Sequence, residues 1–169
     1  MAPNPAKLLP DALREAALRY LDRQDASVHQ VRTVLRRRIY RYGDNATRAE
    51  AQEAIEQLLV RLQESRILDD TRFARGLAES QRRRGASLLK LKQKMKLRGL
   101  PPEIAEQALD SLDGDDAALS EEGSARTYAR KRRLAQRFDL SDPQQRQKAL
   151  ASLARQGFSF DIARRVLEL

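Results

Sequence analysis

The feature that most limits the fold of this chain is an internal repeat centred on a glycine. The segment 95–109 begins Met-Lys-Leu-Arg-Gly-Leu and aligns without gaps with 153–167, which begins Leu-Ala-Arg-Gln-Gly-Phe, at a constant shift of 58 residues. A glycine that ends one helix, followed by an apolar residue and a new helix start, makes a tight reversal between two helices. The repeat therefore predicts a fold built from repeated helical units.

Helix start and stop signals extend this pattern over most of the chain. Asp11 is placed to cap a first helix, and Ser27 with Gln30 has the spacing of a capping box, which Thr47 and Glu50 repeat. The expected fold is all-α, with three tandem three-helix repeats that form an elongated, curved array. Its parts are a disordered lead-in over 1–10 and repeats over 11–67, 68–113 and 114–169. In the last repeat we expect a helix around 125–138, a second from Asp142-Pro143 and a third over 159–169.

In one segment the spacing of apolar residues fits both a strand and a helix. Residues 89–97 alternate between apolar residues and mostly lysine, which is the period of a strand, although Leu88, Leu91 and Met95 also fit one helix face. Lysine is a poor strand residue, and no neighbouring segment offers a strand partner. We therefore predict a helix here.

Each repeat also carries an aromatic residue in its first helix, at Tyr20, Phe73 and Tyr128. Because each lies in an apolar stripe, we interpret these rings as core anchors rather than base-stacking platforms. Gly99 and Gly157 are interpreted in the same way, as helix stops rather than ligand contacts.

The composition argues against catalysis. The chain has no cysteine, which excludes disulfides, thiolate chemistry and most structural zinc sites. His29, the single histidine, has no cysteine or correctly spaced acid beside it, and Asp69-Asp70 is better explained as a helix cap than as a catalytic pair. We expect no enzymatic activity, no cofactor and no metal. No segment resembles a signal peptide or a membrane span, so the chain is expected to be cytoplasmic.

The charge indicates a polyanionic partner. Lysine and arginine number 33 against 24 acids, a formal charge of +9, and three clusters stand out, one of them Arg36-Arg37-Arg38 with Arg41. Such runs are usually solvated faces, but an acid-free window of this density favours phosphate contact. Neutralising about six phosphates would give a slope of roughly −5 in log affinity against log salt. The residues of the two clusters that we expect to bind are Arg82, Arg83, Arg84, Lys90, Lys92, Lys94, Lys96 and Arg98, then Arg130, Lys131, Arg132 and Arg133.

The run Ile67-Leu-Asp-Asp-Thr-Arg-Phe-Ala74, the Leu-Arg-Gly-Leu at 97–100 and the Gly157-Phe158 pair together resemble the RecX regulatory proteins of bacteria. The resemblance covers nearly all of 11–169. It implies three tandem three-helix repeats and a modulator of the RecA recombinase that binds along the groove of the RecA filament on DNA. It further implies inhibition of ATP hydrolysis, strand exchange and coprotease activity, and so a place in homologous recombination, DNA repair and the SOS response.

The first repeat departs from the family pattern. Its second helix runs into Ile39-Tyr-Arg-Tyr-Gly-Asp-Asn45, longer than the short Lys/Arg-Gly reversal of the family. The expected partners are the RecA filament and single-stranded or double-stranded DNA, with the chain a monomer. The alternative is a general helical DNA-binding or nucleoid-associated protein without a recombinase partner.

Overall fold

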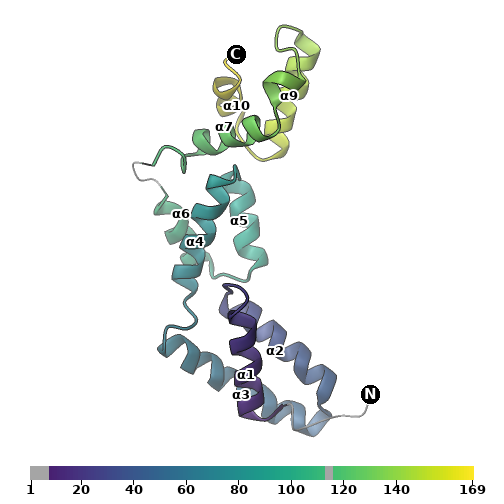
Figure 1. The fold of residues 1–169 in the computed structure, drawn as a ribbon, viewed down its shortest axis with the longest axis vertical. Coiled ribbons are helices and arrows are strands. Elements are labelled where there is room, and N and C mark those ends of the chain that lie inside the picture. Colours follow the sequence, from purple (N-terminus) through teal and green to yellow (C-terminus); the bar gives the residue numbers. More distant parts are fainter. Residues whose placement is uncertain (1–7, 113–115) are drawn as a thin grey trace. The chain divides into compact units, whose positions relative to one another are not determined.

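The structure, a computed structural model, describes residues 8–112 and 116–169. Within them it contains helices and no strand, which confirms the all-α prediction (Figure 1). In chain order the helices are α1 (Pro10–Leu21), α2 (Val28–Tyr42), α3 (Asn45–Glu64), α4 (Asp70–Arg83), α5 (Leu88–Leu97), α6 (Pro102–Asp110), α7 (Glu121–Lys131), α8 (Leu134–Arg137), α9 (Pro143–Arg155) and α10 (Phe160–Val166).

The helices divide into two compact units. The first is the chain up to Phe73 together with Arg98–Leu100, and the second comprises Ala74–Leu97 and the chain from Pro101 onward. The division does not follow the sequence repeats, because the turn after α5 belongs to the first unit. The curvature and the repeat boundaries expected from the sequence stay predictions.

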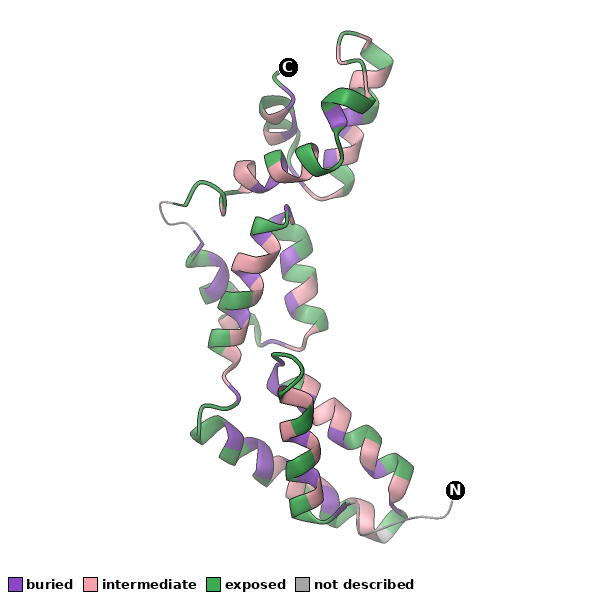
Figure 2. Ribbon diagram, in the orientation of Figure 1, coloured by how far each residue is buried: buried purple, intermediate pink, exposed green. Residues whose placement is uncertain are grey.

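The first unit packs α1, α2 and α3 around an aliphatic core. The buried faces lie at helical spacing, as Figure 2 shows, with Leu13, Val31, Leu35 and Ile55 all fully buried. The half-buried Tyr20 packs against this core, in agreement with its interpretation as an anchor. Full burial of one such side chain contributes about 1.5–3 kcal/mol.

Two helix starts in this unit differ from the prediction. α1 begins at Pro10, preceded by Leu9 with no side-chain cap, because proline's fixed φ suits the first helical position. Asp11 therefore lies inside the helix. Of the lead-in predicted over 1–10, residues 1–7 lie outside the described residues. Leu8 is described and is buried in the core. α3 begins with Asp44 and Thr47 as its capping box, three residues before the predicted Thr47–Glu50 pair. The Ser27–Gln30 capping box is confirmed.

The second unit resolves the ambiguous segment as helix α5. Leu91 and Met95, four residues apart, are fully buried, whereas Leu89 and Leu97 of the alternating set are exposed. α7, α8, α9 and α10 of this unit enclose a core in which the rings of Tyr128 and Phe158 pack with centroids 6.2 Å apart.

The first helix predicted for the last repeat is interrupted. α7 begins at Glu121 and ends at Lys131, and α8 starts only at Leu134, because Arg133 adopts the left-handed conformation with φ 51°. That conformation is unfavourable for residues with a Cβ and stops a right-handed helix. The break allows Leu134 to be buried in the core beside α9.

A pair of serines repeats one contact in both units. Ser27 caps α2 by accepting from the amide of Gln30 at 3.2 Å, and its hydroxyl donates to the carbonyl of Arg98. Ser87 caps α5 by accepting from Lys90 at 3.2 Å and donates to the carbonyl of Gln156.

Each serine bond ends at the residue before a glycine, at the turns that the sequence repeat had aligned. Gly99 and Gly157 have φ values of 67° and 91°, which confirms their role as helix stops. A Cβ on Gly99 would lie 2.2 Å from His29, and one on Gly157 would lie 2.9 Å from Leu89. Close approach therefore requires glycine at both turns, in addition to the positive φ.

Candidate functional site

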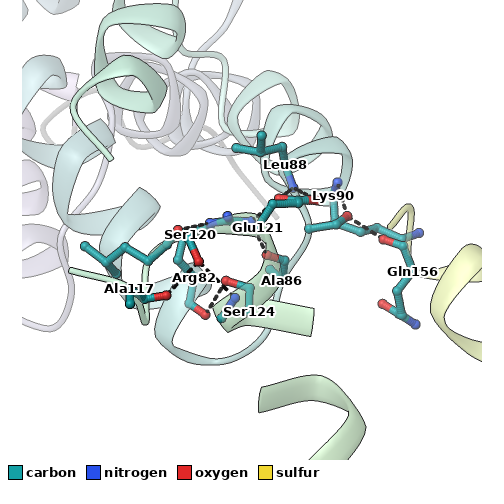
Figure 3. A network of polar contacts seen from close by, with 12 residues as sticks. Arg82, Ala86, Leu88, Lys90, Ala117, Ser120, Glu121, Ser124 and Gln156 are labelled. Atoms are coloured by element: carbon teal, nitrogen blue, oxygen red, sulfur yellow. Dashed lines mark hydrogen bonds and ion pairs between the residues drawn. The ribbon is translucent and has the colours of Figure 1, made fainter. Parts of the chain in front are cut away.

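The first basic cluster does not lie on one surface. Arg82 is 1% exposed, and its guanidinium donates to the carbonyls of Leu119 at 2.7 Å and Ala86 at 3.0 Å (Figure 3). It also forms an ion pair with Glu121, whose carboxylate is one-fifth exposed. A buried charge is tolerated when it is paired and hydrogen-bonded in this way. Arg82 is therefore committed to the fold and is not part of an exposed contact surface.

Glu121 links this buried cation to the start of another helix. Its carboxylate accepts from the amide of Leu88, the first residue of α5, at 3.1 Å, and Ser124 of α7 donates its hydroxyl to the carbonyl of Arg82 at 3.0 Å (Figure 3). Asp70 makes the matching bond in the first unit by accepting from the amide of Val28 at 2.9 Å. In both places a carboxylate near the start of one helix caps the N-terminus of another.

Two basic runs that are distant in sequence meet in the second unit. Lys131 at the end of α7 donates to the main-chain carbonyl of Arg84, just beyond α4, at 3.2 Å. The turn after α4 packs closely on α7, since a Cβ on Gly85 would lie 2.8 Å from the amide nitrogen of Tyr128. The fold thus brings the end of the first basic cluster to the second.

The cations around this meeting point are exposed. Arg83 is paired with Asp116 at 2.8 Å, and the guanidinium of Arg132 lies 5.8 Å from the centre of the Tyr128 ring. Within the described residues, no ion pair involves Arg84 or the other cations of this group. We call the set the α4–α7 surface, and it comprises Arg83, Arg84, Arg130, Lys131, Arg132 and Arg133.

The lysines of α5 differ in how far they are exposed. Lys90, Lys92 and Lys96 are exposed, whereas Lys94 is half-buried and donates to the side chain of Gln81 on α4 at 2.8 Å. Arg98 is half-buried and belongs to the first unit, where its carbonyl accepts from Ser27. The α5 cations therefore do not extend as one continuous row.

The carboxylates proposed as helix caps have that role. Asp69 accepts from the amide of Arg72 at 2.8 Å and so caps α4. Burial raises the pKa of Asp70, and the neighbouring charge of Asp69 acts in the same direction, while the bond from Val28 opposes it. Within the part of the chain that the structure describes, no cluster of three or more metal-ligating side chains occurs. Among the helices of residues 8–112 and 116–169, none combines the length and the hydropathy that a membrane span requires.

Sequence reasoning missed the residues that connect one repeat to the next. Ser87 and Glu121 have no exceptional sequence signal taken singly. A sequence signal for Ser87 exists only when two segments are compared. Ala26-Ser27 and Ala86-Ser87 each place an alanine and a capping serine before an apolar residue, and they are 60 residues apart. Because the two serines are 60 residues apart and the two glycines 58, an alignment of the repeats without gaps does not bring the serines together.

Comparison with known proteins gives two matches to family models. Residues 69–109 match the model described as "RecX, second three-helix domain", and residues 121–167 match "RecX, third three-helix domain". The matched segments contain the three turns with a positive-φ glycine, at Gly85, Gly99 and Gly157, and every residue of the α4–α7 surface.

Similar whole proteins were also found. "Regulatory protein RecX" of Myxococcus xanthus is 36% identical over 98% of this chain and 89% of its own length. The protein of the same name from Chromohalobacter salexigens is 31% identical over 91% of this chain and 90% of its own length. The crystal structure of RecX from Lactobacillus salivarius, at 21% identity, superposes with a TM-score of 0.69 over 94% of each chain, which supports the fold.

Proposed function

Because this chain belongs to the RecX family, we propose that it regulates the RecA recombinase by binding the filament that RecA forms on DNA. The family is one of regulatory proteins, and this chain is proposed to act by binding, without catalysis. Inhibition of RecA's ATPase, strand exchange and coprotease activities is the expected sign of the effect. The proposal places the protein in the cytoplasm as a monomer.

The observation that carries the proposal is the α4–α7 surface. Its six cations come from two segments, 83–84 and 130–133, and a single acid of the described residues, Asp116, pairs with one of them. A DNA strand and its bound recombinase form a polyanion, and a concentrated positive surface steers association with such a partner. We assign the filament contact to this surface, with exposed Lys90, Lys92 and Lys96 as additional cations.

Arg82 is left out of the contact, although it belongs to the same sequence run. Its side chain is 1% exposed and has three partners within the unit, so a phosphate or carboxylate of another molecule cannot reach it. Lys94 is likewise engaged with Gln81. The contact set is therefore smaller than the sequence cluster.

A titration of RecA's DNA-dependent ATPase tests the proposal. Half-inhibition is expected at protein concentrations well below those that saturate the same DNA without RecA, measured in the same buffer because such affinities depend strongly on salt. The alternative, a general DNA-binding protein, predicts inhibition only when bare DNA is saturated. That outcome would reject the filament as the target.

A further inference from the structure

The C-terminal half of α2, in the first unit, presents an exposed aromatic ring among arginines. Tyr40 is 72% exposed, more than Phe160 at 59%, the other strongly exposed aromatic residue of the described chain. Arg37, three residues before Tyr40, and Arg41, the residue after it, are both exposed. The family models match from residue 69 onward and do not include this face.

The ring of Tyr40 is held in place from one side. The guanidinium of Arg48, on α3, lies 5.4 Å from the ring centre and donates to the carbonyl of Tyr40 and to the side chain of Asn45, both at 3.2 Å. Such fixation lowers the entropy that the ring would lose on binding a partner. A surface hollow between α2 and α3 adjoins the ring and is lined by Arg36, Ile39, Tyr40, Arg48, Ala49 and Gln52.

Two arginines of this face, Arg37 and Arg41, are without a carboxylate partner among the described residues. The run from Arg36 to Tyr42 contains four arginines and no acid. Glu56 pairs with Arg32 at 3.0 Å and with Arg36 at 3.6 Å, on the side facing α3. Spaced four residues apart on a helix, the side chains of Arg37 and Arg41 are neighbours.

We propose that this face binds single-stranded nucleic acid, with a base stacked on the Tyr40 ring and phosphates at Arg37 and Arg41. An aromatic ring beside cations is the combination that binds unpaired strands, since every unpaired base has a face that can stack. A duplex offers no such face, because its bases are already stacked. The centre of a protein interface is instead depleted of charge, unlike the surroundings of Tyr40.

Fluorescence anisotropy of the full chain with a labelled 20-nucleotide oligothymidine, without recombinase, tests this face. Tyr40→Ala is expected to weaken binding about tenfold, because one stacked base contributes that order of affinity. Tyr40→Phe keeps the ring and is expected to bind within about twofold of the wild type. Phe160→Ala, which removes an exposed ring from the second unit, is the matched control and should bind unchanged.

A 20-base-pair duplex separates stacking from a general loss of fold. Tyr40→Ala should leave duplex affinity unchanged. Equal losses for both probes, or no loss for the single strand, would overturn the proposal. If Tyr40→Ala reduces inhibition of RecA but not binding of the single strand, the face contacts protein, which also overturns it.

Charge and fluorescence give two further readouts. Arg37→Gln with Arg41→Gln should reduce the salt slope for the single strand by about 1.4, or roughly 0.7 for each phosphate contact. Arg14→Gln with Arg61→Gln removes the same charge from another part of the unit and should leave the slope unchanged. The chain has four tyrosines and no tryptophan, so its emission comes from tyrosine, and the difference from Tyr40→Phe isolates the Tyr40 ring. Oligothymidine should quench the wild type more than Tyr40→Phe, and equal quenching would contradict stacking at Tyr40.

This inference does not depend on a recombinase partner. Failure of the Tyr40 variants to change DNA binding leaves the ATPase titration unaffected, since that experiment depends on the α4–α7 surface in the second unit.

Discussion

The ammonium group of Lys131 donates a hydrogen bond to the main-chain carbonyl of Arg84, 47 residues earlier, at 3.2 Å. The bond joins the C-terminal ends of α7 and α4, where a cation also compensates the helix dipole. It makes one surface of two separate basic runs. The proposed regulatory contact therefore depends on how α4 and α7 pack.

Reversing charge on this surface is expected to weaken filament binding. Arg84→Glu with Arg130→Glu should reduce affinity at least about tenfold, since each reversal turns an attraction to a polyanion into a repulsion. Circular dichroism should show unchanged helicity, because neither side chain is buried. Lys148→Glu with Arg155→Glu, exposed on α9, changes the net charge equally and should bind much more tightly than the surface variant. Similar losses in both variants would mean that net charge, not this surface, controls binding.

Replacing Arg82 is expected to lower the free energy of unfolding much more than replacing its neighbour Arg83. Arg82→Met keeps much of the volume but leaves Glu121 and two carbonyls without their partner, which should cost about 3 kcal/mol in the free energy of unfolding. Arg83→Met removes a cation whose side chain is 57% exposed and should cost less than about 1 kcal/mol. Urea unfolding followed by circular dichroism measures both. Equal midpoints for the two variants would contradict the buried network.

Ser87→Ala is expected to cost more than an ordinary cap. The change removes the acceptor for the Lys90 amide and the donor to the carbonyl of Gln156, so a loss of about 2 kcal/mol is expected. Ser159 caps α10 through the amide of Ile162 but is exposed. Ser159→Ala should therefore cost only about 1 kcal/mol. Unfolding in urea checks the order, which a merely local role for Ser87 would not produce.

Replacing glycine by alanine should destabilise the protein at position 99 and stabilise it at position 76. Gly99→Ala places a Cβ 2.2 Å from His29 at a φ of 67°, and a loss of more than about 1 kcal/mol is expected. Gly76 lies within α4 with nothing within 4 Å of an added Cβ. Gly76→Ala should therefore stabilise the protein by about 0.5–1 kcal/mol. Thermal unfolding of the two variants measures the difference, and a destabilised Gly76→Ala variant would contradict the open environment.

Asp70 is expected to make the stability of the folded protein increase as the pH is lowered, relative to a variant that does not titrate at this position. Burial raises its pKa above the ordinary value of 3.8, so the folded protein holds this proton more tightly than the unfolded chain. Its contribution to stability is therefore fully present below the ordinary value and is lost as the pH rises through the raised one. Asp70→Asn keeps an oxygen acceptor for the Val28 amide but does not titrate. The stability of the wild type relative to this variant should rise as the pH falls from about 7 to about 3.5, and a fall would show that the pKa is lowered instead.

The helical architecture was predictable because its signals are local. The Ser27–Gln30 capping box and the glycine at position 99 act within a few residues of chain, and both behave as the sequence indicates. The errors arose where two local signals competed. Asp44 and Glu50 are both three residues from Thr47, and the structure pairs Thr47 with Asp44. The break after Lys131 has no glycine or proline to mark it in the sequence; it lies at the left-handed Arg133, directly before the buried Leu134.

The three consecutive arginines of α4 and the turn after it mark the limit of such reasoning. Successive residues on a helix point about 100° apart, so one member of a run can be buried while its neighbours stay in water. The order of residues along the chain was enough to show that the protein is helical, repeated and basic, because periodicity, capping and charge are properties of nearby residues. Only the tertiary structure decided that Arg82 is buried beside Glu121 and that Lys131 lies at Arg84. The physical reason is that these pairings depend on which helix packs beside which, and no local spacing encodes that choice.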